Sequence, residues 1–257
     1  MLMGEAKAAM AFTDPPYNVA VDGHVSGFGR QRHREFAMAS GEMDRDEFTS
    51  FLAEVFAQMI AWSEPGSLHY VCMDWRHMSE MLSAGEARFS DLKNLCVWTK
   101  PSGAMGSLYR SQHELIFVWK NGRGRHRNNV ELGRHGRNRT NVWSYPGIAS
   151  FRHSESGDLL AMHPTCKPVP LVADAILDVT ARGDVIVDPF LGSGTTLIAA
   201  ERVGRVAHGF EIDPLYCDTI VRRWQALTGD NATHLPGSAT FDEIATQRCD
   251  ANLGEAA

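Results

Sequence analysis

The sequence predicts an α/β protein with a doubly wound, mostly parallel sheet, because strand-like and helix-like runs alternate along it. An apolar run at Val185–Val187 enters a turn with two glycines, Gly192 and Gly194, and a helical run follows. A second apolar run then ends in Glu211, 19 residues after Gly192. Strand, glycine turn, helix, strand and acid in this order are typical of a Rossmann-like unit, in which the acid binds ribose hydroxyls. A plain tight turn is the structural alternative.

The side chains of this turn discriminate between nucleoside cofactors. A dinucleotide site needs a third small residue so that the helix N-terminus can approach a pyrophosphate, and Leu197 fills that position. Asp188, at the end of the strand, would repel a pyrophosphate but would suit a cation. S-Adenosylmethionine carries an ammonium, a sulfonium and a ribose and has no phosphates. The charge pattern therefore favours S-adenosylmethionine over NAD.

Apolar spacing and caps predict the other elements in order. A first strand is expected at 10–13, a helix at 46–63 that Asp44 can cap, a short buried strand at 68–72 and a helix at 76–83. Strands follow at 94–99 and 114–119, and helices at 163–180 and 214–225. The tail at 228–257 is expected to be surface-packed or frayed, with a short helix near 241–244.

Composition indicates a protein without a membrane span, because 44% hydrophobic content comes with no long apolar run. The five cysteines lack CxxC spacing, which indicates neither a zinc site nor a disulfide framework and fits a reducing cytoplasm. Net charge is −6, yet residues 100–152 hold ten basic and two acidic side chains. This asymmetry suggests a localised cationic face for phosphates.

Near the start of the chain, Asp14, Pro15, Pro16 and Tyr17 form a second motif. Here the sequence resembles the amino-methylating DNA methyltransferases, whose catalytic motif has the form D/N/S-P-P-Y/F, and the resemblance runs from about Phe12 to Trp224. A catalytic motif before the cofactor motif is the order of the permuted β group. The resemblance implies a methyltransferase sheet with one antiparallel strand and double-stranded DNA as partner. It leaves open whether the enzyme serves restriction-modification, regulation or a mobile element. Dimerisation is compatible with it.

The Asp14 motif suits transfer to an exocyclic amino group, which is a poor nucleophile because its lone pair is delocalised into the ring. A carboxylate and the Pro15 carbonyl could each accept one amino hydrogen and so favour a tetrahedral nitrogen. Two prolines stiffen the turn, and Tyr17 offers a face on which a flipped base can stack. An incidental turn is the alternative.

The resemblance also implies a cofactor site. The pattern His163-Pro-Thr165-Cys-Lys167-Pro is similar to the family's segment around the methionine part of the cofactor, where Thr165 and Lys167 would meet its carboxylate; an ordinary helix cap is the alternative. The cofactor-binding residues expected from these motifs are Thr13, Asp14, His163, Thr165, Lys167, Asp188, Phe190, Gly192, Ser193, Gly194, Thr195, Glu211, Ile212 and Asp213.

Two arginine-rich stretches are the expected DNA contacts, a loop after the catalytic motif and the segment 121–141, although either could be a solvated charged face. Their arginines are Arg30, Arg32, Arg34, Arg123, Arg125, Arg127, Arg134, Arg137 and Arg139. We expect one catalytic domain over 1–257 with an inserted target-recognition region at 101–162. Because the catalytic strand begins so early, we also expect a further N-terminal domain in the natural protein.

The sequence thus predicts an adenine-N6 DNA methyltransferase, since Asp in the first motif position resembles adenine enzymes and Ser is commoner in cytosine-N4 enzymes. Cytosine-N4 methylation is the nearest alternative. A nicotinamide-dependent oxidoreductase and a non-catalytic DNA-binding module are more distant ones.

Overall fold

The computed structural model describes residues 3–20, 38–103, 108–134, 136, 138–147, 166–235 and 237–255. Several predicted site residues lie outside the described residues, namely Arg30, Arg32, Arg34, Arg137, His163 and Thr165.

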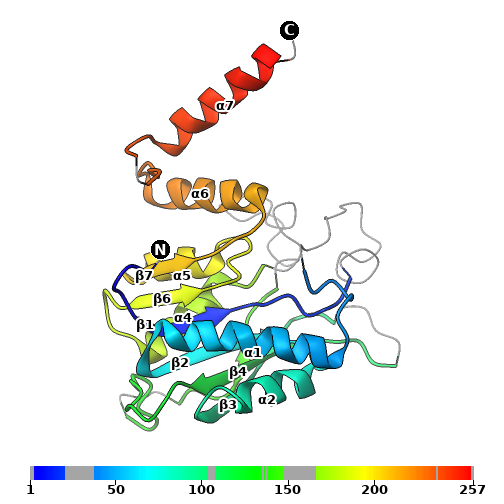
Figure 1. Ribbon diagram of the computed structural model, residues 1–257. Helices are drawn as coiled ribbons and strands as arrows, with labels where there is room; N and C mark the ends of the chain where they lie inside the picture. The colour runs from blue at the N-terminus through cyan, green and yellow to red at the C-terminus, as the bar shows by residue number, and fades with distance from the viewer. Residues whose placement is uncertain are drawn as a thin grey trace.

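The described residues form one sheet of seven strands in the order β5-β3-β4-β2-β1-β6-β7 (Figure 1). Only β4 runs against its neighbours, since it pairs antiparallel with β2 and β3 while the other pairings are parallel. The predicted doubly wound sheet with one antiparallel strand is therefore confirmed. The strands are β1 (Ala8–Thr13), β2 (Ser63–Met73), β3 (Asp91–Thr99), β4 (His113–Lys120), β5 (Val142–Ser144), β6 (Val185–Asp188) and β7 (Val206–Gly209).

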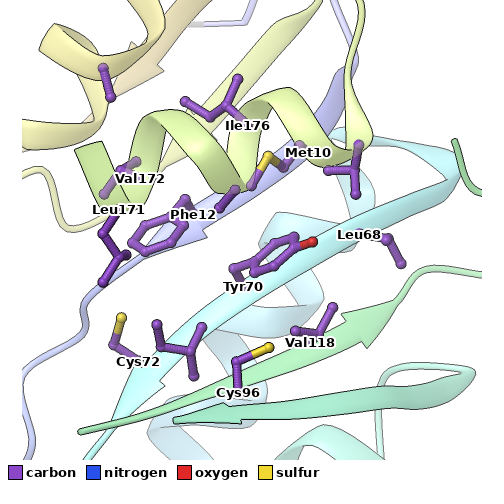
Figure 2. Packing of buried hydrophobic residues seen from close by; sticks show 14 of the residues in the cluster. Met10, Phe12, Leu68, Tyr70, Cys72, Cys96, Val118, Leu171, Val172 and Ile176 are labelled. Atoms are coloured by element: carbon purple, nitrogen blue, oxygen red, sulfur yellow. The ribbon is translucent and has the colours of Figure 1, made fainter. Parts of the chain in front are cut away.

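Helices cover both faces of the sheet. The side chains of α1 and α2 pack into one apolar cluster, with alternate residues of β1 and β2. Those of α4 and α5 pack into a second cluster on the other face, where Leu171 and Ile176 lie over Phe12 and Tyr70 (Figure 2). The helices are α1 (Arg45–Ala61), α2 (Met78–Glu86), α4 (Val169–Val179), α5 (Thr195–Arg202), α6 (Pro214–Thr228) and α7 (Phe241–Glu255).

The connections reverse direction between β1 and β6. From β1 the chain passes through α1 to β2 on one side, and from β6 it passes through α5 to β7 on the other side. Ala11 of β1 lies opposite Val187 of β6, so the carboxyl ends of these two strands are adjacent. In open α/β sheets, ligands bind in the crevice at such a reversal point. The residues that follow β1 and β6 are therefore in the position at which such folds bind ligands.

Local signals in the sequence placed most elements correctly. Asp44 caps α1, with its carboxylate accepting from the N–H groups of Asp46 and Glu47, and the Glu47 side chain accepts in return from the Asp44 N–H. The expected tail helix is longer than predicted, because α7 occupies 241–255 and extends away from α6 (Figure 1).

One prediction about a segment boundary was wrong. Strand β2 begins at Ser63, five residues before the predicted start, because Ser63 pairs with Ala8 and the pairing with β1 continues after an irregularity in register. The described part of the range 101–162, which was expected to hold the target-recognition region, contains β4 and β5 of the main sheet.

Gly85 provides a test of the packing between α2 and the sheet. A Cβ atom at this position would lie 2.1 Å from the ring of Trp119, which is itself almost fully buried in β4. We therefore expect Gly85→Ala to lower the free energy of unfolding by about 1–3 kcal/mol, as overpacked core positions do. Urea unfolding measures this loss. Ser83→Ala, on the exposed side of the same helix, is the matched control, and equal unfolding midpoints for the two variants would contradict the prediction.

Candidate active site

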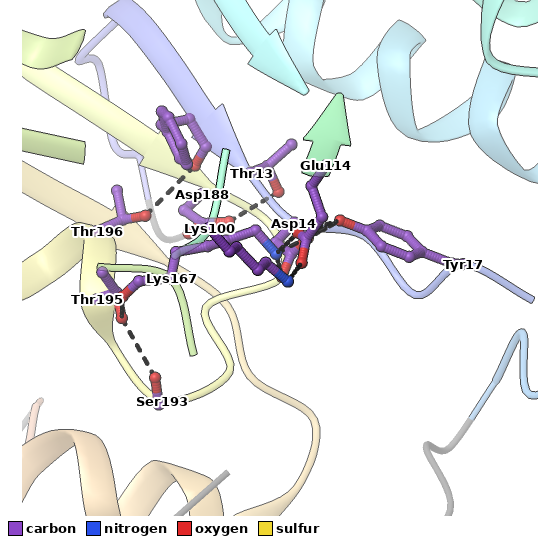
Figure 3. A network of polar contacts seen from close by, with 11 residues as sticks. Thr13, Asp14, Tyr17, Lys100, Glu114, Lys167, Asp188, Ser193, Thr195 and Thr196 are labelled. Carbon is purple, nitrogen blue, oxygen red and sulfur yellow. Dashed lines mark hydrogen bonds and ion pairs between the residues drawn. The ribbon is translucent and has the colours of Figure 1, made fainter. Parts of the chain in front are cut away.

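The two predicted motifs meet at the reversal point of the sheet, although 175 residues separate their contacting members. Thr13, the last residue of β1, donates its hydroxyl hydrogen to Asp188 Oδ1 over 2.8 Å (Figure 3). The same oxygen of Asp188 accepts from the Phe190 N–H over 3.0 Å. Asp188 is thus held at the end of β6, next to the catalytic motif that follows β1.

The glycine turn after β6 has the backbone that only glycine adopts easily. Gly192 and Gly194 have φ angles of 53° and 82°. A Cβ on Gly194 would also approach the Ile220 side chain to 3.0 Å. The turn delivers the chain directly into α5, whose first residue is Thr195. Ser193 and Thr195 are buried in the turn, with their hydroxyl oxygens 3.3 Å apart.

Glu211 joins the glycine turn to the end of β7. One carboxylate oxygen accepts from the Gly192 N–H and the other from the Asp213 N–H, each over 2.8 Å. Phe210 and Ile212, on either side of Glu211, are 55% and 66% exposed. A carboxylate beside an apolar, uncovered surface suits a nucleoside, because a carboxylate can accept from ribose hydroxyls and apolar side chains can pack against a base.

The catalytic motif forms one end of a chain of charged groups. Tyr17 Oη donates to Asp14 Oδ1 over 2.6 Å, and Lys167 Nζ lies 2.5 Å from Asp14 Oδ2 (Figure 3). Lys167 Nζ is also 2.9 Å from Glu114 Oε2, and Lys100 Nζ is 2.5 Å from Glu114 Oε1. Two carboxylates and two ammonium groups therefore alternate along this cluster, which we call the Asp14–Lys100 chain.

Burial and neighbouring charges determine which groups of the Asp14–Lys100 chain are protonated. Burial raises the pKa of Asp14, and Glu114 raises it further, while Lys167 opposes both effects. Burial also acts against ionised Glu114, yet Lys167 and Lys100 together lower its pKa to about 2. The pKa of Lys167 is raised, because Asp14 and Glu114 outweigh the opposing effect of burial. Lys167 and Glu114 are therefore a charged pair at neutral pH.

The Lys167 ammonium group, which was expected to meet the carboxylate of the cofactor, contacts carboxylates of the protein. The carboxylates that it meets are Asp14 and Glu114 of the protein, and its side chain is only 5% exposed. Its position at the site is as expected, because Pro168 and α4 follow directly, and its carbonyl oxygen accepts from the Thr195 hydroxyl over 3.2 Å. The described structure thus places Lys167 between Thr195, which follows the glycine turn, and Asp14.

Sequence reasoning missed Glu114 and Lys100. The sequence marked Glu114 only as the first residue of a strand. Glu114 precedes the apolar run Leu115–Trp119, and the first residue of an antiparallel strand lies at the carboxyl edge of its parallel neighbours. The position of this acid could therefore have indicated that Glu114 lies at the site. Lys100 follows β3 at this same edge.

The arginines after β4 lie at the opposite edge of the sheet from Asp14. Since β4 is antiparallel, its end at Lys120 lies beside Leu68 at the amino edge, about 20 Å along the strand from Glu114. Residues 124 and 125 pack there against the Pro65-Gly66 backbone. Figure 1 shows this segment, in green, at the end of the sheet away from α1's first turn. Arg123, Arg125 and Arg127 are therefore on this edge, and DNA contact by them stays a prediction.

Arg139, another expected DNA contact, forms ion pairs within the protein. Its guanidinium forms ion pairs with Asp178 (2.6 Å) and Asp174 (3.7 Å) on α4, and it lies 4.6 Å from the centre of the Trp143 ring. These contacts attach the segment before β5 to α4. Arg134 is largely exposed, with a long ion pair to Glu131 of 3.8 Å.

Comparisons with known proteins agree with this geometry. A family model described as DNA methylase matches residues 8–222. The type II methyltransferase M2.MboI of Moraxella bovis is 24% identical over 85% of this chain and 81% of its own. The type II methyltransferase M.ScaI of Streptomyces caespitosus is 38% identical over a shorter stretch, 35% of this chain and 30% of its own.

Solved structures share the fold. The PvuII DNA methyltransferase (cytosine-N4-specific) superimposes with a TM-score of 0.62 at 19% identity, over 86% of this chain and 82% of that one. The M1.HpyAVI–SAM complex gives a TM-score of 0.61 at 20% identity, over 86% and 90% of the two chains. Among the described residues, no helix combines the length and the apolar character needed to cross a membrane. With the family model spanning both motifs, the chain belongs to the DNA methylase family.

Proposed function

We propose that this protein transfers a methyl group from S-adenosylmethionine to the N6 amino group of adenine in double-stranded DNA. The observation that carries the proposal is the contact between Thr13 and Asp188, which brings the catalytic motif against the glycine turn. A nitrogen and a methyl donor must share one site for direct transfer, and this contact makes one site out of two distant motifs.

The residues around the glycine turn fit S-adenosylmethionine. Glu211 would accept from the ribose hydroxyls, with Phe210 and Ile212 beside the base, and Asp188 would face the cationic part. Gly192 and Gly194, which have no side chain, let the backbone approach the nucleoside. When bound, S-adenosylmethionine supplies an electrophilic methyl group on a sulfonium. The protein has to place a nucleophilic nitrogen in line with that methyl group.

The catalytic motif would activate the amino nitrogen by accepting its hydrogens. Asp14 would accept one N–H, and the Pro15 carbonyl the other, so that the nitrogen lone pair turns toward the methyl group. Asp14 then holds the proton that the methylated nitrogen must lose, and its raised pKa suits that task. Tyr17 is fixed by its hydrogen bond to Asp14, and its ring would stack on the extruded base.

Adenine is favoured over cytosine by the identity of the first motif residue, Asp14, whereas the family's cytosine-N4 enzymes more often have Ser there. Expression in a methylation-deficient host, followed by mass spectrometry of nucleosides and sequencing of the methylated sites, tests this choice. N6-methyladenine is the expected product. N4-methylcytosine would refute the adenine assignment and keep the amino-methyltransferase assignment, and unmodified DNA would refute both.

The pKa of Asp188 provides a pH test of the cofactor site. Burial raises this pKa to about 6, so Asp188 is ionised at pH 7.5 and mostly protonated at pH 5. Because an ionised carboxylate attracts a sulfonium and a protonated one does not, we expect the affinity for S-adenosylmethionine to fall by about tenfold over this range. Calorimetric titrations at several pH values measure it. Asp188→Asn should flatten the profile, and an equally steep profile in that variant would assign the dependence to another group.

A further inference from the structure

Both carboxylate oxygens of Asp14 accept hydrogen bonds from protein groups (Figure 3). Tyr17 donates to Oδ1 over 2.6 Å, and the Lys167 ammonium donates to Oδ2 over 2.5 Å. Under the proposed function, on which this inference rests, the target amino group donates an N–H to this same carboxylate. Each oxygen can accept a second hydrogen bond, but an ammonium group on Oδ2 draws electron density from the carboxylate, so Lys167 competes with the amino group for Asp14. Asp14 accepts the amino hydrogen more strongly when Lys167 moves away.

A buried ammonium group can leave one carboxylate only for another acceptor, because an unpaired buried charge is strongly disfavoured. Glu114 is that acceptor, since its Oε2 is already 2.9 Å from Lys167 Nζ. Lys100 holds the other oxygen of Glu114 at 2.5 Å, which keeps the carboxylate in place. The ring of Trp98 lies beside both cations, with its centre 5.9 Å from Lys167 Nζ and 4.7 Å from Lys100 Nζ.

We propose that Glu114 is a positioning residue that takes over Lys167 when the target base enters, and thereby frees Asp14 to accept the amino hydrogen. Before DNA arrives, Lys167 stands in for the amino group, since both present an N–H to Asp14. It keeps the carboxylate ionised and aligned. In this step the Lys167 ammonium group moves from a position between Asp14 and Glu114 to Glu114 alone, and no covalent bond breaks.

The balance of charges in the Asp14–Lys100 chain predicts the combined effect of substituting Glu114 and Lys167. In the wild type, two carboxylates face two ammonium groups. Glu114→Gln leaves Asp14 opposite both cations, so Lys167 stays on Asp14 and competes with the amino group. Adding Lys167→Met removes the competing cation and restores the balance between Asp14 and Lys100. The double variant should therefore be faster than Glu114→Gln alone.

The test uses the full chain and a duplex with the recognition sequence identified by host sequencing, with 2-aminopurine next to the target adenine, so that the target keeps its amino group and its departure from the stack changes the fluorescence of its neighbour. Single-turnover transfer of a labelled methyl group at saturating S-adenosylmethionine should be about tenfold or more slower in Glu114→Gln, and the double variant should recover several-fold of that loss. Base entry, followed by 2-aminopurine fluorescence, should weaken in Glu114→Gln and recover in the double variant. Calorimetry with S-adenosylmethionine checks that each variant is folded. Glu54→Gln, an exposed glutamate on α1, is the matched control.

The outcomes separate this inference from the proposed function. A wild-type chain that methylates no DNA overturns the proposed function and the inference with it. An active wild type with Glu114→Gln at the wild-type rate overturns the inference alone, and so does a double variant as slow as or slower than Glu114→Gln. Glu114→Asp keeps the charge, so it should retain more activity than Glu114→Gln, and equal losses in the two variants would also overturn it.

Discussion

Asp14→Asn is expected to abolish methyl transfer, with a rate loss of about 10³-fold or more, while affinity for S-adenosylmethionine stays close to that of the wild type. The amide keeps the shape of the side chain but removes the negative charge that accepts the amino hydrogen. The cofactor turn is attached to Glu211 and to β6, and those contacts do not involve the Asp14 side chain.

Labelled methyl transfer to DNA and calorimetric titration with S-adenosylmethionine measure the two quantities on the same preparation. A parallel loss of binding would mean that Asp14→Asn disturbs the site as a whole, through the released Lys167. Normal turnover in Asp14→Asn would refute the catalytic assignment. Asp46→Asn, an exposed carboxylate in the first turn of α1, is the matched control.

Glu211→Gln is expected to weaken the binding of S-adenosylmethionine by about 10- to 100-fold, because hydrogen bonds to a charged group are worth about 1.5–3 kcal/mol. The loss has two sources. The acceptors for the ribose hydroxyls lose their charge, and the contacts to the N–H groups of Gly192 and Asp213 weaken, which loosens the turn.

Calorimetry measures the Glu211→Gln affinity, and thermal unfolding without ligand shows whether the turn alone is affected. Glu201→Gln is a suitable control, because Glu201 lies on the neighbouring helix α5 and accepts a hydrogen bond from the half-buried Trp224 instead. Unchanged affinity in Glu211→Gln would remove this carboxylate from the cofactor site, and an equal loss in Glu201→Gln would point to a general effect of charge.

The features that could be predicted from the sequence are those set by neighbouring residues. Asp44 and Glu47 mark the start of α1 by themselves, and Gly192 and Gly194 mark a tight turn wherever it lies in the fold. Alternating strands and helices predicted a mostly parallel sheet, and the one antiparallel strand was expected from the resemblance to the DNA methyltransferases. The order of the strands came from the structure.

The features that escaped prediction depend on which edge of the sheet a segment reaches. Lys167 meets Asp14 across 153 residues, and no local pattern records that contact. The arginine-rich segment has the composition of a phosphate-binding face, but the antiparallel direction of β4 carries it to the far edge. Arg139 shows a second limit, since its partners Asp174 and Asp178 come from a helix that is distant in sequence.

The position of β1 in the middle of the sheet has a consequence for how the chain acquires its shape. Its partner β6 is synthesised more than 170 residues later, so a nascent chain carries one bare strand edge until most of the polypeptide has emerged. Such an edge is a template for pairing with other chains. Pairing of sequence-distant strands is also slow, because loop closure precedes any gain from contact. Assembly of the catalytic crevice is therefore among the last events of folding, and it is the step at which aggregation competes.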